Sequence, residues 1–111
     1  MKAAVLCMIL ACPLIAHPVK MVASWYGPRH EGKKMANGQR FNPRAFTCAH
    51  KTFPLGTRLR VWMDGVACTV QVTDRGPFIQ GRDIDLSQAA ALSLGLIKPG
   101  VCLVGVEVLG G

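Results

Sequence analysis

Two aspartates occupy positions from which they could act on a polysaccharide. Asp74 ends an alternating apolar segment and is followed by Arg-Gly-Pro, and Asp85 precedes an alanine-rich segment. Paired carboxyl groups in different environments can cleave a glycosidic bond, because one stays protonated as an acid while the other stays charged. The same residues also fit a turn and a helix cap. Catalysis therefore requires that the fold bring both carboxylates into one cleft.

Other side chains could assist such a site, although each also has a structural explanation. His50 precedes a Phe-Pro-Leu-Gly turn and could be a structural histidine bonded to the backbone. Trp25, Tyr26 and Phe78 could stack on the faces of sugar rings or could simply pack the core. No Cys-x-x-Cys or His-Glu-x-x-His pattern occurs, so we expect no metal site.

A β-hairpin is the clearest structural signal in the sequence. Residues 57–63 and 66–73 both alternate between apolar and polar side chains, and Asp64-Gly65 separates them. An Asp-Gly pair between alternating segments is typical of a two-residue hairpin turn. Closing this turn pairs Met63 with Val66, Val61 with Cys68 and Leu59 with Val70. The apolar residues then share one face, as burial of that face requires.

The remaining elements complete a mainly β domain. We expect strands at residues 22–26 and 102–108, and a polar, exposed loop at residues 29–42. The segment Gln88–Leu94 predicts a helix of two turns that begins at Asp85 or Ser87 and ends at Gly95. A small closed barrel would leave no strand edge exposed.

The first residues are typical of an export signal. Lys2 precedes a short apolar run, and Ala16 is small enough to precede a cleavage point. We therefore expect a signal peptide at residues 1–16, a linker at 17–21 and one domain at 22–111. The apolar run is too short for a stable transmembrane anchor. A lipid anchor at Cys12 is the alternative to simple cleavage.

The net charge and the cysteines indicate which binding partners and which redox compartment to expect. The chain has 13 basic and 6 acidic residues and a formal net charge of +7, which would attract it to anionic polymers. Nucleic acid is not expected as a partner, because the basic residues are scattered without a binding motif. An oxidising compartment would allow one disulfide among the cysteines after the signal. We expect Cys48–Cys68, because Cys68 points inward in the hairpin, with Cys102 as a buried thiol.

Several linked motifs resemble the rare lipoprotein A (RlpA-like) family. They follow one another in the family's order over residues 22–109: Ala23–Gly27, Ala36–Phe41, Ala49–Thr57, Thr73–Phe78, Gly81–Ser87 and Ala89–Ala91. The resemblance implies a six-stranded double-psi β-barrel with one or two short helices, as in expansins. It also implies periplasmic or secreted work on peptidoglycan by a lytic transglycosylase, which leaves a 1,6-anhydro sugar without using water.

The resemblance assigns functions to individual residues. The family's Glu, His and Asp positions fall on Gln39, His50 and Asp74, and the acid/base aspartate of related barrels falls on Asp85. Gln39 departs from the family pattern, because glutamine cannot transfer a proton at neutral pH but can hydrogen-bond a sugar hydroxyl. Glu31 is a nearby candidate to replace the missing acid.

The leading hypothesis is therefore a monomeric lytic transglycosylase that needs no cofactor. Asp74 or Asp85 would serve as acid and then base, with His50 and Gln39 holding the sugar ring. We expect further substrate contacts from Tyr26, Arg40, Arg75 and Phe78. A non-catalytic, glycan-binding module of the expansin type is the main alternative, favoured by Gln39. A small secreted effector or inhibitor acting on a protein is a third possibility that no specific residue supports.

Overall fold

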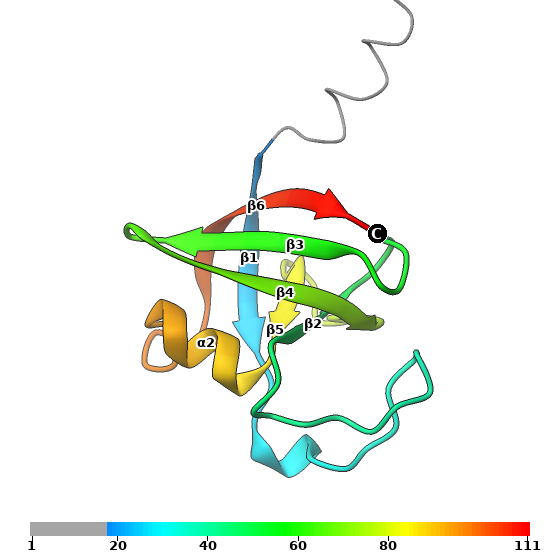
Figure 1. Cartoon of the computed structure of the whole chain (residues 1–111). Helices are drawn as coiled ribbons and strands as arrows, with labels where there is room; N and C mark the ends of the chain where they lie inside the picture. Colours follow the sequence, from blue (N-terminus) through cyan, green and yellow to red (C-terminus); the bar gives the residue numbers. More distant parts are fainter. Residues whose placement is uncertain (1–17) are drawn as a thin grey trace, which may run out of the picture.

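The computed structural model describes residues 18–111, in which strands wind into a closed barrel (Figure 1). The expected signal peptide and the alternative lipid anchor at Cys12 lie outside the described residues. The elements are β1 (Val19–Trp25), the 3-10 helix η1 (Pro28–His30), β2 (Thr47–His50), β3 (Arg58–Met63), β4 (Val66–Asp74), β5 (Ile84–Leu86), α2 (Gln88–Leu94) and β6 (Cys102–Gly110). Neighbouring strands follow the order β1-β5-β2-β4-β3-β6. The six-stranded barrel with two short helices is as expected.

The barrel closes because its strands bury one common face. The pairs β1–β5 and β2–β4 are parallel, and the other strand pairs are antiparallel. Leu59, Val61, Val70 and Val72 on the hairpin are at most 1% exposed. They pack with inward residues of the other strands and with Ala90, Ala91 and Leu94 of α2. This packing is the continuous core that patterns of period two predict.

The predicted hairpin is confirmed in every pair. β3 and β4 are antiparallel and pair Met63 with Val66, Val61 with Cys68 and Leu59 with Val70. Asp64 has a φ of 51° and Gly65 a φ of 80°, as a turn with two left-handed residues requires. The predicted helix is also confirmed: Ser87 Oγ accepts the Ala90 N–H as N-cap, and Gly95 ends the helix with a φ of 81°.

Asp85 is the exception to the predicted helix. It lies in β5, not at the start of the helix, and it pairs with Ser24 of β1 and Ala49 of β2. β1 also begins at Val19, so residues 19–21 of the expected linker belong to a strand. They pair with β6, which makes them part of the barrel wall.

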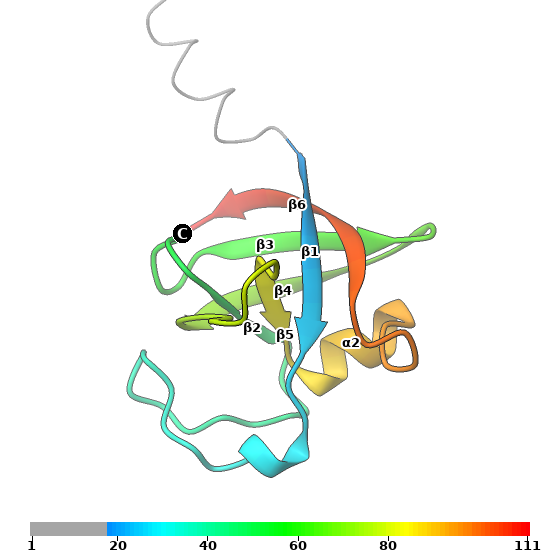
Figure 2. The ribbon, with the colours of Figure 1, turned by 180° about the vertical axis from the view of Figure 1, so that it is seen from behind.

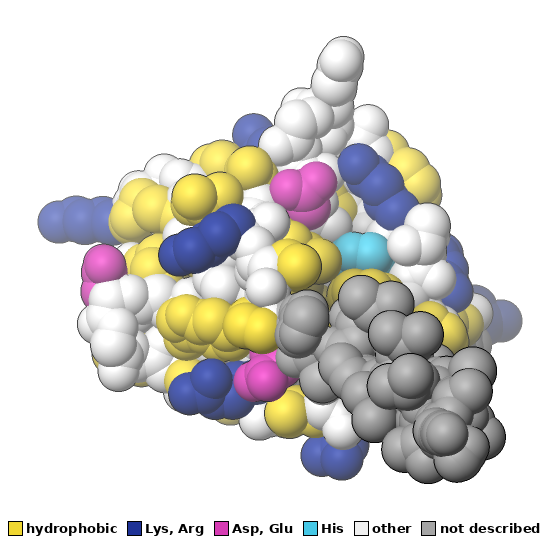
Figure 3. Space-filling model, turned by 90° about the horizontal axis from the view of Figure 1, so that it is seen from above, with side chains coloured by type: hydrophobic (Ala, Val, Ile, Leu, Met, Phe, Trp, Pro, Cys, Tyr) yellow, Lys and Arg dark blue, Asp and Glu magenta, His cyan; other side chains and the backbone are white. Residues whose placement is uncertain are grey.

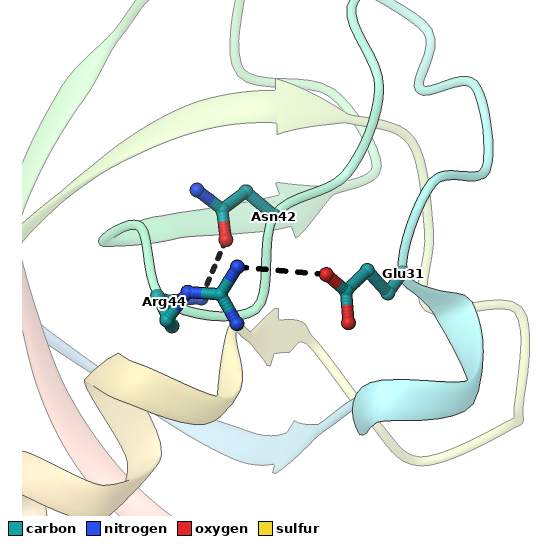
Figure 4. Close-up of polar contacts among 3 residues, drawn as sticks. All are labelled: Glu31, Asn42 and Arg44. Carbon is teal, nitrogen blue, oxygen red and sulfur yellow. Dashed lines mark hydrogen bonds and ion pairs between the residues drawn. The ribbon is translucent and has the colours of Figure 1, made fainter.

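The segment between β1 and β2 differs from the expected exposed loop. It extends from one end of the barrel in both views (Figures 1 and 2). Met35 and Phe41 are buried and pack with Tyr26 and Ala49 in a second small core. An ion pair between Arg44 and Glu31 links the two ends of this segment, and the Arg44 N–H donates locally to Asn42 Oδ1 (Figure 4). The segment is therefore attached to the barrel.

The expected Cys48–Cys68 disulfide is wrong. Cys48, Cys68 and Cys102 are free thiols, and Cys102 is half-buried where full burial was expected. Cys48 pairs with Val72 of β4, four residues along that strand from Cys68. Four residues of strand span roughly 13 Å, whereas disulfide-linked Cα atoms lie within about 7 Å of each other. Within residues 18–111, no helix is long and apolar enough to cross a membrane.

Candidate active site in a cleft beside the barrel

One cleft lies between the barrel and the attached segment, and both expected aspartates line it. Its volume is about 260 Å³. It also takes in the predicted residues Tyr26, Arg75 and Phe78. The structure therefore brings five of the eight predicted catalytic and substrate-binding residues together.

The strand pairing explains why the two aspartates meet. β2 lies between β4 and β5, and Ala49 of β2 is the register partner of both Asp74 and Asp85. Neighbouring strands are about 4.8 Å apart, so the two Cα atoms are separated by roughly 10 Å across Ala49. The small side chain of Ala49 leaves the space between the carboxyl groups open.

Asp85 has the features of a general acid. Its carboxyl group is partly buried, and Oδ1 accepts a 2.9 Å hydrogen bond from the Ser24 hydroxyl. Burial raises the pKa of Asp85, while the Ser24 hydrogen bond and the charges of Arg82 and His30 oppose that rise. Asp74 is also close enough to raise this pKa slightly. A raised pKa favours the protonated form that an acid needs.

Asp74 is held by backbone groups at the end of β4. Its Oδ1 accepts 2.9 Å hydrogen bonds from the N–H groups of Ala36 and Arg75. The first bond joins the segment between β1 and β2 to the barrel, and the second fixes the turn after β4. These two bonds set the orientation of the Asp74 carboxylate.

Two aromatic residues of the cleft occupy different environments. Tyr26 is buried, its ring centroid lies 4.5 Å from that of Phe41, and burial raises the pKa of its hydroxyl. Phe78 is 84% exposed at the rim, where its ring is free to meet a ligand. Trp25, also a stacking candidate, instead packs against the barrel core.

His50, expected to hold the sugar ring, is not among the residues that line this cleft. Successive side chains of a strand point to opposite faces, and Ala49 already faces the cleft. His50 lines a second cleft with residues of β1, with Lys51 and with Asp83. Figure 3 views the end of the molecule where β1 begins and shows histidine atoms at the surface, near acidic and basic side chains.

Gln39 and Arg40 also lie outside the cleft. Both are exposed, and Gln39 Oε1 accepts a 3.2 Å hydrogen bond from the Asn37 amide. Arg40 Nη1 donates to the carbonyl of Gly32. Met35, whose N–H donates to the Gln39 carbonyl in the same turn, lines the cleft, whereas the Gln39 side chain is exposed. Glu31, the suggested replacement acid, is instead paired with Arg44.

The attached segment contributes to the cleft through residues other than the expected Gln39 and Arg40. His30, Lys33, Lys34 and Met35 line it, and the His30 ring meets Tyr26 edge to face at 5.6 Å. The apolar residue Met35 within a polar run was the signal that this segment is anchored. Among residues 18–111, no group of three His, Cys, Asp or Glu side chains is placed to hold a metal ion.

The chain is similar to a known family and to several known proteins. Residues 19–106 match the family model described as "Lytic transglycolase". The chain is 47% identical over 91 residues to the endolytic peptidoglycan transglycosylase RlpA of Campylobacter jejuni, covering 80% of this chain and 33% of that protein. It is 45% identical over 91 residues to the Helicobacter pylori protein of the same name, covering 80% and 29%. The chain thus spans about a third of the length of these relatives.

Solved structures show the same fold at lower identity. The Streptomyces papain inhibitor superimposes with a TM-score of 0.69 at 23% identity, covering 85% of this chain and 96% of that one. An expansin of Clavibacter michiganensis gives a TM-score of 0.67 at 20% identity, covering 84% and 50%. These two likenesses show the fold. The family match over residues 19–106 and the relatives of 45–47% identity show that the chain belongs to the RlpA-like lytic transglycolase family of double-psi β-barrels.

Proposed function

We propose that this protein is a lytic transglycosylase acting on the glycan strands of peptidoglycan. The observation that carries the proposal is the placement of Asp74 and Asp85 on either side of Ala49 in one cleft. Relatives named as peptidoglycan transglycosylases support the choice of substrate. The reaction would cut the β-1,4 bond between MurNAc and GlcNAc and leave a 1,6-anhydro-MurNAc end.

Asp85 is the better acid of the two, because burial favours its protonated form. Its proton would pass to the glycosidic oxygen as the bond from that oxygen to C1 of MurNAc breaks. The Asp85 carboxylate would then accept the proton of the 6-hydroxyl as O6 bonds to C1. The carboxyl group ends protonated, as it began, and no water is consumed.

The other cleft residues would hold the substrate through this sequence. The negative charge of Asp74 would stabilise positive charge developing at C1. Phe78 at the rim would stack on a sugar face, with Tyr26 forming the apolar floor. Lys33 and Lys34 would attract acidic groups of the strand. Proton transfer between Asp85 and the sugar requires no metal or organic cofactor.

The substrate implies that the protein acts outside the cytoplasm, in the periplasm or after secretion. Export would follow cleavage of residues 1–16, with lipid attachment at Cys12 as the alternative route. Cleavage would remove Lys2 and leave 12 basic and 6 acidic residues, a net charge of +6 that would draw the protein to the anionic wall. In this proposal the protein acts as a monomer.

The non-catalytic alternative depended on Gln39, which lies outside the cleft and hydrogen-bonds Asn37. A missing proton carrier at that position therefore does not argue against catalysis by the aspartates. Digestion of purified sacculi followed by mass spectrometry tests the proposal. We expect anhydro-muropeptides from the folded protein. Binding to sacculi without release of any fragment would favour the expansin-type module instead.

A further inference from the structure

We propose that His50 is a positioning residue, which acts through Arg75 to hold the segment that carries Asp74. The inference rests on the proposed function, because it concerns the geometry of the same cleft. It reassigns a residue that the family resemblance would place against the substrate. The connection runs from the His50 ring to the turn at residues 50–53, then to Arg75 and finally to Asp74.

The His50 imidazole organises the turn that follows β2. Its Nδ1 atom accepts hydrogen bonds from the N–H groups of Thr52, at 3.2 Å, and Phe53, at 3.0 Å. The ring also stacks on the Phe53 ring, with centroids 3.9 Å apart and planes inclined by 11°. His50 is only 8% exposed. One side chain thus fixes the backbone and the side chain of Phe53.

The carbonyl groups of this turn hold Arg75. Arg75 Nη1 donates to the carbonyl of His50 at 3.1 Å and to that of Phe53 at 2.6 Å. The backbone N–H of Arg75 donates to Asp74 Oδ1 at 2.9 Å. If the turn loosens, Arg75 loses both carbonyl partners, and the Asp74 carboxylate loses a fixed donor.

The outer nitrogen of His50 faces away from the chemistry. Nδ1 is an acceptor, so the ring proton of the neutral imidazole lies on Nε2. His50 lines the second cleft, whose other charged residues are Lys20, Lys51 and Asp83, whereas both aspartates line the first. Arg75 is the remaining charged residue near His50 within residues 18–111, and it donates to the His50 backbone carbonyl. Burial, opposed by Asp83, lowers the pKa of His50, which keeps Nδ1 free to accept.

Two substitutions distinguish hydrogen-bond acceptance at Nδ1, which holds the turn, from proton transfer at Nε2. In His50→Asn, the side-chain Oδ1 lies near the position of Nδ1 and can accept the same two N–H bonds. In His50→Gln, the amide reaches toward the position of Nε2 instead. We expect His50→Asn to retain kcat within about threefold, and His50→Gln to lose roughly 10²-fold in kcat with KM little changed, as for a misplaced catalytic group. A lower kcat for His50→Asn than for His50→Gln would overturn the proposal. Equal losses of kcat in the two variants would overturn it as well.

Lys51→Gln is a matched control, because Lys51 lies in the same turn but bonds only the Arg82 carbonyl. It should keep wild-type kcat. A second comparison uses His50→Ala, Arg75→Ala and the double variant. If His50 acts through Arg75, the double variant should be no slower than the slower single variant. If the losses in kcat of the two single variants multiply in the double variant, His50 does not act through Arg75.

Nitrogen NMR of the His50 ring provides a readout that does not depend on activity. We expect a bare Nδ1 and a protonated Nε2 in the wild-type protein. A protonated Nδ1 at neutral pH would overturn the proposal whether or not the protein cleaves glycan. Conversely, an inactive wild-type protein with the expected ring signals would contradict the proposed function alone.

Discussion

The Ser24 hydroxyl donates a 2.9 Å hydrogen bond to Oδ1 of Asp85, its register partner across the parallel pair β1–β5. This bond stabilises the charged carboxylate and so opposes the rise in the pKa of Asp85 that burial causes. Ser24 is 3% exposed, so water does not replace the hydroxyl freely. The neighbouring strand therefore helps to set the pH at which Asp85 can act as an acid.

Ser24→Ala should move the alkaline limb of the kcat/KM profile to higher pH. Loss of the hydrogen bond destabilises the carboxylate, so the pKa of Asp85 rises further and the acid stays protonated over a wider range. Profiles of the two proteins on the same glycan strands check this. Ser93→Ala on α2 is the control, because Ser93 does not line the cleft and its hydroxyl donates to the Ala90 carbonyl. A shift to lower pH would contradict the assignment of Asp85 as the acid.

Gln39→Glu should leave activity within about twofold of wild type. The side chain lies outside the cleft, and a carboxylate can still accept the Asn37 amide bond. Initial rates of anhydro-sugar release check the prediction. A gain of 10²-fold or more, as expected from restoring a missing general acid, would show that this position reaches the substrate.

Acidification should destabilise the protein through His50. Burial lowers the pKa of His50 below 6.5, so the unfolded chain takes up its proton at higher pH than the folded one. The contribution to the free energy of unfolding is complete above about pH 6.5 and is lost as the pH falls through the folded-state pKa. Urea unfolding at several pH values should show this loss. His50→Asn, which does not titrate, should show a smaller dependence over the same range.

Gly105→Ala should destabilise the barrel by roughly 1–3 kcal/mol, as expected for overpacking. A Cβ atom at Gly105 would overlap the indole of Trp62, which lies across this position from β3. Thermal unfolding measures the effect. Thr69→Ala, at an exposed position of β4, which lies on the other side of β3 from β6, should change the free energy of unfolding by less than about 0.5 kcal/mol. Equal effects of the two substitutions would contradict the packing argument.

Long-range pairing explains why some elements were predictable and others were not. The hairpin register followed from alternation and from Asp64-Gly65, both of which are local signals. β5 has only three residues, and β2 has four. Such short segments carry no clear period, so the sequence alone makes Asp85 as good a candidate for the helix start as Ser87. Their partners lie elsewhere in the chain, and only pairing makes them strands.

The sequence indicated which residue types form the site. It did not indicate in which direction each side chain points. Asp74 and Asp85 stand out by their local contexts, and the structure joins them. Whether His50 or Ala49 faces the cleft depends on the pairing of β2 with its neighbours. The direction of Gln39 depends on how Met35 anchors the preceding turn. The disulfide prediction failed for a similar reason, because the distance along β4 is set by register.

The most direct test of the account compares wild-type protein with Asp85→Asn on peptidoglycan glycan strands in oxygen-18-labelled water. The wild-type protein should release 1,6-anhydro-MurNAc ends that contain no labelled oxygen, since O6 of the sugar replaces water. Asp85→Asn should fold normally and lose roughly 10²–10⁴-fold in rate. Incorporation of labelled oxygen into the products, or undiminished cleavage by Asp85→Asn, would contradict the account.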